Sequence, residues 1–192
     1  YVKLVDGGLT DNYGLSSILI ARAASGNAHG PFTEADAVRL RRMLFLVVDA
    51  GRPPSGDWAK SVEGPSGAEV GIAAADTAID AAARLSADAF KAMIEEWRES
   101  IVRFRCSLPD ETVRRHLKNT KNWNCTDVSF FVEVIGFEAL NDDRSEKLKA
   151  MPTRLSLSRA DVETAVSAGR DVTRSSEIVQ RYVRERFRRL DE

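Results

Sequence analysis

The chain contains three short segments that are made up mostly of apolar residues. The first occupies Val2–Val5 and stops at Asp6, and the second, Met43–Val48, stops at Asp49. A third lies in Val128–Phe137. Such runs, without alternation of apolar and polar positions, predict strands that are buried on both faces, as in parallel sheets covered by helices. We therefore expect strands of a mostly parallel sheet at these positions.

A helix is predicted between the first two runs. Apolar residues recur at helical spacing over Leu15–Ala23. Asp11 or Asn12 could cap this helix by accepting hydrogen bonds from its free N-terminal amides, and we expect Gly26 to end it. Strand, helix and strand in this order predict a βαβ unit with a right-handed crossover.

Three further helices follow in the sequence. A long one is expected over Ala68–Phe104, where large apolar residues recur at helical spacing and should face the core. Ser158, with Asp161 three residues later, resembles a capping box for a helix ending near Gly169. The last helix carries apolar residues three and four positions apart. The stripe of the long helix comprises Phe90, Ile94, Trp97, Ile101 and Phe104, and that of the last helix Ile178, Val179, Tyr182, Val183, Phe187 and Leu190.

The organisation predicted from these elements is one α/β domain with added C-terminal helices. We find no internal repeat and no second domain. Residues 1–56 form the βαβ unit, residues 57–127 a loop and a long helical insertion, and residues 128–192 a strand and the C-terminal helices. A chain of 192 residues is long enough to bury a real core.

Composition excludes some classes of function. The formal net charge of -1 gives no reason to expect nucleic-acid binding. No apolar run approaches the ~20 residues that a membrane span needs, so we expect a soluble or peripheral protein. Arginines gather late in the chain, and the acidic residues between them favour the solvated face of a helix. An anionic membrane surface is the alternative partner. These residues are Arg184, Arg186, Arg188 and Arg189.

The two cysteines and two histidines do not form a metal-binding pattern. Cys106 and Cys125 are not in a C-x-x-C arrangement, and two reduced thiols are the default interpretation. A disulfide between them is the alternative if the protein is exported, whereas a cytoplasmic location is otherwise favoured. His29 and His116 lie in polar contexts without a cluster of metal-ligating residues. We assign no metal and no cofactor.

The segment from Leu4 to Leu15 carries the candidate chemistry. Asp6 ends a strand, and an aspartate at the carboxyl end of a buried strand points into the crevice where open α/β sheets bind ligands. Gly7 and Gly8 follow it and let the backbone turn sharply and approach other groups closely. The positive end of the next helix would favour the ionised form of Asp6, which a general base near neutral pH requires.

This string, D-G-G-L-T-D-N-Y-G-L, resembles the D-G-[GA] segment of patatin-like phospholipases. Residue by residue, the resemblance assigns the catalytic aspartate to Asp6, the motif glycines to Gly7 and Gly8, and the following Asp-Asn pair to Asp11 and Asn12. It departs from the family at residue 14, a glycine where the family often has proline. The resemblance implies a three-layer sandwich, of which this chain would form part, and a Ser–Asp dyad that hydrolyses lipid esters.

Two later segments support the resemblance by their order. Residues 46–52 look like the next core strand of that fold, and residues 151–158 with 168–170 resemble the segment that closes many bacterial members. The family's G-x-S-x-G nucleophile and its glycine-rich oxyanion loop are absent. Because the chain starts at Tyr1 in a strand-like run, we interpret it as a fragment, a processed product or a trimmed chain. Its expected partners are the N-terminal part that carries the serine and a lipid or ester substrate.

Other interpretations of the same residues remain open. Asp6 could be only a turn or cap residue, and Asp11 and Asn12 are interpreted as structural more readily than as catalytic. Asp6, Asp11 and Asp49 could instead bind a divalent cation. The parent protein could also be a non-catalytic module that binds lipid or protein. An apolar sheet edge left by missing strands predicts a partner chain or self-association.

The loop and the tryptophans also have two interpretations each. The loop over residues 52–67, rich in Pro, Gly and Ser, could be a lid over an acyl pocket or an ordinary surface loop. Trp58 in that loop is a candidate contact with a lipid interface. Trp97 and Trp123 are interpreted as packing residues.

Overall fold

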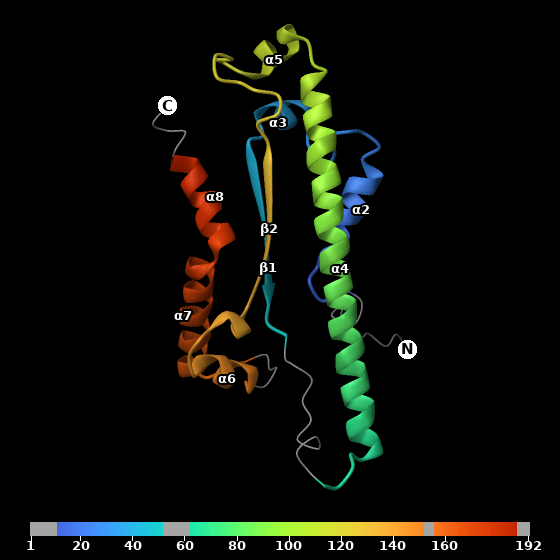
Figure 1. Ribbon diagram of the computed structural model, residues 1–192, viewed down its shortest axis with the longest axis vertical. Helices are drawn as coiled ribbons and strands as arrows, with labels where there is room; N and C mark the ends of the chain where they lie inside the picture. The colour runs from blue at the N-terminus through green and yellow to red at the C-terminus, as the bar shows by residue number, and fades with distance from the viewer. Residues whose placement is uncertain (1–10, 52–61, 152–155, 188–192) are drawn as a thin grey trace. The chain divides into compact units, whose positions relative to one another are not determined.

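The computed structural model describes residues 11–51, 62–151 and 156–187 (Figure 1). The chain consists of two compact units. The first unit takes the described residues within Tyr1–Tyr13, Leu46–Arg84 and Glu133–Glu192, and the second takes Gly14–Phe45 and Leu85–Val132. The prediction of one domain in three parts stays a prediction. The elements in the described residues are α2 (Ser16–Ala24), α3 (Glu34–Arg39), β1 (Arg42–Asp49), α4 (Gly67–Cys106), α5 (Asp110–His116), β2 (Ser129–Gly136), η2 (Phe137–Ala139), α6 (Arg144–Lys149), α7 (Arg159–Ser175) and α8 (Glu177–Phe187).

The two strands predicted within the described residues are present. β1 and β2 pair in a two-stranded parallel sheet, and the two ribbons run in the same direction in Figure 1. The mixed α/β class is thereby confirmed, whereas the strand expected over Val2–Val5 lies outside the described residues. Burial of β1 on both faces was a wrong prediction, because Leu46 is 39% exposed and Val48 66% exposed. Both faces are covered only when helices span the whole sheet, and here Val47 alone is buried in this strand.

The core of the second unit forms where α4 meets the two strands. Four of the five predicted stripe residues are buried, with Phe90 and Ile101 fully enclosed, and Phe104 is half-buried. Phe45 of β1 meets the Phe90 ring edge-on at 5.3 Å between centroids, and Trp97 meets Phe130 of β2 at 5.6 Å. The helical stripe read from the sequence is therefore confirmed as the face that packs on the sheet.

A disulfide and a buried arginine close the end of α4. Cys106 and Cys125 form a disulfide, so the default interpretation of two reduced thiols was wrong. Spacing in the sequence cannot show that the end of α4 comes within 4.9 Å, between Cα atoms, of the segment before β2. Arg105 is fully buried beside this bridge and donates hydrogen bonds to the carbonyls of Leu40 and Asn124.

The electrostatics of Arg105 follow from its burial. Removal from water lowers the pKa of its guanidinium to about 10, and the neighbouring Arg41 acts in the same direction while Asp127 opposes both. Arg41 and Asp127 form an ion pair with each other. The Arg105 guanidinium also lies over the Trp123 ring at 5.2 Å from its centroid, and Trp123 donates its indole N–H to the Val38 carbonyl. Trp123 is thus a packing residue, as predicted.

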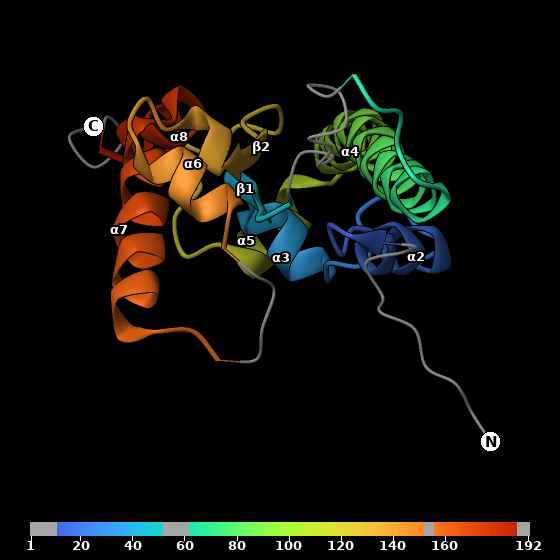
Figure 2. The same ribbon diagram turned by 90° about the horizontal axis from the view of Figure 1, so that it is seen from below.

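The C-terminal helices belong to the first unit. The Ser158 hydroxyl accepts a hydrogen bond from the Asp161 amide, which confirms the predicted start of α7. The helix does not end near Gly169, as predicted, but continues to Ser175. A glycine inside a helix costs about 1 kcal/mol relative to alanine. Burial of Ala168 and Val172 on either side outweighs that cost. In both views α6 lies against α7 (Figures 1 and 2).

The start of α2 differs from the prediction and its end agrees with it. Neither Asp11 nor Asn12 caps α2, because the helix begins at Ser16 with Leu15 as its N-cap. Gly14 has a φ of 67°, a left-handed conformation that separates the Asp-Asn pair from the helix and that glycine adopts at little cost. At the other end Gly26 has a φ of 63° directly after the C-cap Ser25, as expected for a helix-terminating glycine.

Candidate functional site

The candidate catalytic segment ends at the first residues that the structure describes, Asp11 and Asn12. Asp6, Gly7 and Gly8 fall outside the described residues, so their predicted roles stay predictions. Asp11 is half-buried and Asn12 is exposed. The next residue, Tyr13, makes a long-range contact within the first unit.

Tyr13 ties the segment after the motif to the carboxyl end of β1. Its hydroxyl donates a hydrogen bond of 2.8 Å to Asp49 Oδ2, across 36 positions of sequence. Asp49 is the last residue of β1, at the edge of the sheet where parallel α/β folds bind ligands. The contact lies within the first unit and is part-buried.

The second oxygen of Asp49 is also engaged. Asp49 Oδ1 accepts a hydrogen bond of 2.7 Å from the Gly51 amide, which turns the chain away from the strand. A Cβ at residue 51 would lie 2.8 Å from this oxygen, so a larger residue there would require the Asp49 side chain to shift. The carboxylate of Asp49 therefore holds two chain segments together through two different oxygens. In the residues that the structure describes, no group of three His, Cys, Asp or Glu side chains could hold a metal ion.

The environment of Tyr13 is acidic. Partial burial raises the pKa of the Tyr13 hydroxyl to about 12, and the hydrogen bond to Asp49 and its negative charge act in the same direction. Asp80 and Glu138 add smaller contributions of the same sign. Tyr13 is therefore a neutral hydrogen-bond donor throughout the physiological range, and its role is to position the chain.

Space beside Asp49 is small. A cavity of about 20 Å³ is lined by Val48, Asp49, Ile135, Phe137 and Val172, with the backbone of two glycines. That volume suits a single water molecule and is far below the several hundred Å³ of a typical ligand pocket. This cavity is therefore too small to hold an ester substrate.

The remaining candidates are structural. His116 Nε2 lies 2.7 Å from Glu34 Oε1, and His29 Nδ1 lies 2.9 Å from the Phe32 carbonyl oxygen. Trp97 is buried in the core, as expected of a packing residue, and Trp58 lies outside the described residues. The sequence interpretation missed Tyr13, although its place directly after the Asp-Asn pair was a usable signal. It named Asp49 only as a cation ligand.

Comparison with known proteins adds no relative. No family model, no curated protein and no solved structure matches the chain. Among the described helices, none combines the length and the apolar character needed to cross a bilayer.

Proposed function

We propose that this chain supplies the aspartate of a lipid acyl hydrolase with a Ser–Asp dyad. The observation that carries the proposal is the motif string from Asp6 to Tyr13, together with the hydrogen bond from Tyr13 to Asp49. That bond holds the segment after the motif at the carboxyl end of a parallel strand, where a catalytic aspartate of an α/β enzyme is expected. The serine and the oxyanion loop would be supplied by an N-terminal part of the same protein.

The mechanism that follows is acyl transfer in two steps. Asp6 would take the proton of the serine hydroxyl as its oxygen attacks the ester carbonyl, and backbone amides would stabilise the oxyanion. Collapse of the tetrahedral intermediate would release the alcohol, which receives the proton from Asp6. Asp6 would then take a proton from water as it attacks the acyl-enzyme, and would return this proton to the serine oxygen when the free acid is released. Because an aspartate is a weak base, its position must supply much of the rate, and the Tyr13–Asp49 contact supports that position.

The expected three-layer sandwich belongs to the same proposal. Within the second unit, α4 covers the strand positions of Phe45 and Phe130. Within the first unit, Val172 of α7 lines a cavity with Val48 and Ile135. A three-layer sandwich would require helices on both faces of such a sheet. The disulfide favours the exported alternative, since such bonds persist in oxidising compartments.

The test is ester hydrolysis by the protein expressed from its complete coding region. Asp6→Asn is expected to abolish hydrolysis of a lipid ester while the circular dichroism spectrum and the melting temperature stay unchanged. Asp110→Asn is the matched control, because it makes the same substitution at a side chain that is 91% exposed. Labelling by a fluorescent fluorophosphonate should require the N-terminal part, and the 192-residue chain alone should not label. Full activity in Asp6→Asn would refute the assignment, and an unlabelled complete protein would favour the non-catalytic binding module.

A further inference from the structure

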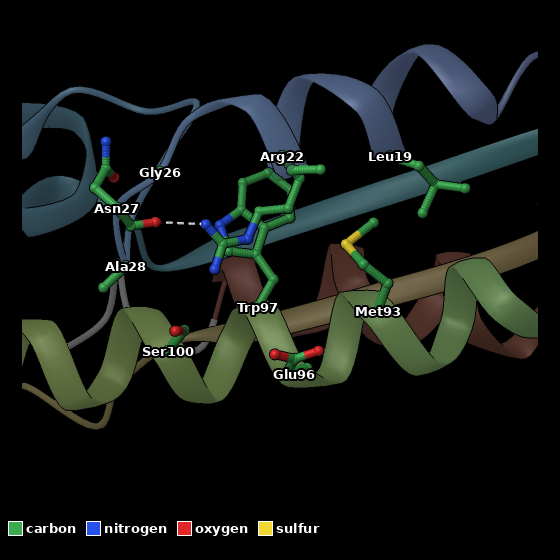
Figure 3. A pocket seen from close by; sticks show the side chains of 10 residues that line it. Leu19, Arg22, Gly26, Asn27, Ala28, Met93, Glu96, Trp97 and Ser100 are labelled. Atoms are coloured by element: carbon green, nitrogen blue, oxygen red, sulfur yellow. Dashed lines mark hydrogen bonds between the residues drawn. The ribbon is translucent and has the colours of Figure 1, made fainter.

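A pocket of about 670 Å³ lies entirely within the second unit. One wall is α2 with the loop that follows it, and the other is α4, as Figure 3 shows. Its size is within the range of 300–1,000 Å³ that is typical of small-molecule sites. The chemistry of its walls, described next, indicates what kind of molecule would fit.

Arg22 of α2 places an unneutralised cation in this pocket. Its Nη1 donates to neutral acceptors, the Asn27 carbonyl at 2.5 Å and the Gly30 carbonyl at 3.3 Å. The guanidinium lies 5.9 Å from the centroid of the Trp97 ring (Figure 3). In the described part of the chain, Arg22 makes no ion pair, and its Nε and Nη2 have no hydrogen-bond partner. Two of its nitrogens can therefore donate to an anion.

Glu96 of α4 places the opposite charge on the facing wall. Within residues 11–51, 62–151 and 156–187 it makes no ion pair and no hydrogen bond, and it does not pair with Arg22. Ser100, one turn further along α4, also lines the pocket, and its hydroxyl has no partner among the same residues. A ligand carrying only an anion would meet Arg22 but be repelled by Glu96, so a single negative charge does not match these walls.

The pocket is not uniformly polar. Figure 3 shows Leu19 and Met93 together at one end, with Asn27 and Ser100 toward the other and Arg22 and Glu96 between them. An apolar group can contact Leu19 and Met93 while polar atoms remain beside the charged side chains. The arrangement provides one cation, one anion, a free hydroxyl and an apolar end.

We propose that this pocket binds a small zwitterion, with its carboxylate or phosphate on Arg22 and its ammonium group on Glu96. A short apolar part would lie against Leu19 and Met93. The shared chemistry is that of a choline phosphate ester and of an apolar α-amino acid, which are two sources of the same pair of charges. The inference does not depend on the role of Asp6, since every residue that carries it belongs to the second unit.

The experiment is isothermal titration calorimetry on the full 192-residue chain with glycerophosphocholine and with leucine. Three probes carry a charge of one sign only: inorganic phosphate and hexanoate are anions, and choline is a cation. At least one zwitterion should bind more tightly than each of its halves. Tighter binding of glycerophosphocholine would identify a lipid headgroup as the source, and tighter binding of leucine would identify an amino acid.

Variants test which charges are responsible. Arg22→Gln and Glu96→Gln should each weaken the zwitterion about tenfold, equivalent to about 1.4 kcal/mol. Arg103→Gln, which removes the same charge from a side chain on α4 that is 67% exposed, should leave binding unchanged. Because Arg22 also holds the loop after α2, the exposed Glu96 gives the cleaner result. Binding that Glu96→Gln does not weaken, or zwitterions that bind no better than the single-charge probes, would overturn the proposal.

Discussion

Removing the Cys106–Cys125 disulfide should destabilise the second unit without changing any other contact directly. The bridge links the end of α4 to the segment before β2, and its two cysteines are 19 positions apart. We consider the double variant Cys106→Ser with Cys125→Ser, and separately the reduction of the unaltered protein. Cys106 is exposed, so a reductant can reach the bridge without prior unfolding.

The expected loss follows from the length of the closed loop. In the chain-entropy model, a cross-link over a loop of this size removes about 11 cal/mol/K from the unfolded ensemble, or about 3 kcal/mol at 25 °C. For a domain of this size each kcal/mol corresponds to roughly 2–4 °C in melting temperature, so we expect a fall of about 10 °C. A second contribution arises because Arg105 and Asn124, which hydrogen-bond to each other, directly precede the two cysteines in sequence.

Tryptophan fluorescence during thermal and urea unfolding measures this loss. Trp97 and Trp123 both belong to the second unit, and Trp58→Phe in every variant removes the remaining tryptophan. A reductant should lower the melting temperature of the parent to that of the double serine variant and should leave the serine variant unchanged. If the parent melts at the same temperature with and without reductant, and free thiols are found before reduction, the bridge does not form and the reasoning is refuted.

Two further predictions concern single side chains. Arg105→Met should lower the free energy of unfolding by about 2–4 kcal/mol, because the Leu40 and Asn124 carbonyls lose a charged donor in a buried site. Urea unfolding measures this loss. The control is Arg103→Met at an exposed side chain, which should cost less than about 0.5 kcal/mol. Tyr13 has its pKa raised to about 12, above the 10.0 of a free tyrosine, so its contribution to stability is complete below pH 10 and is lost as the pH rises toward 12. Ultraviolet difference spectroscopy should show a late-titrating tyrosine that Tyr13→Phe removes and that Asp49→Asn shifts to lower pH; a titration curve unaffected by Asp49→Asn would contradict the contact.

Sequence patterns correctly predicted the helices and helix ends that depend on residues close to one another in the sequence. The stripe from Phe90 to Ile101 is spaced for one face of a helix, and it packs on the strands because burying large apolar side chains is the main favourable term in folding. Ser158 caps α7, and Gly26 ends α2, through contacts that span only a few residues. The same local reasoning failed where two local signals competed. Gly169 reads as a helix end, yet the burial of its neighbours carries α7 past it.

Contacts between distant segments could not be predicted in the same way. Arg105 follows the exposed Arg103 by two residues near the end of α4, but its position along the helix directs it into the core. Only the fold brings it to the carbonyls of Leu40 and Asn124, which are 65 and 19 positions away. The Cys106–Cys125 bridge and the Tyr13–Asp49 hydrogen bond have the same origin, because each depends on which chain segments meet.

Asp6 and Asp49 show why contacts between distant segments matter for assigning a function. Both aspartates end an apolar run and precede a glycine within two residues, so the sequence gives them similar surroundings. For Asp49 the structure shows a positioning role, because one oxygen accepts a hydrogen bond from the Tyr13 hydroxyl and the other from the Gly51 amide. A catalytic base must instead keep an oxygen free for the nucleophile. In the proposed function, Asp6 keeps an oxygen within reach of the serine hydroxyl, a property that spacing in the sequence cannot encode. Asp6→Asn probes this property, since the amide preserves the size of the side chain while removing the charge and the basicity of that oxygen.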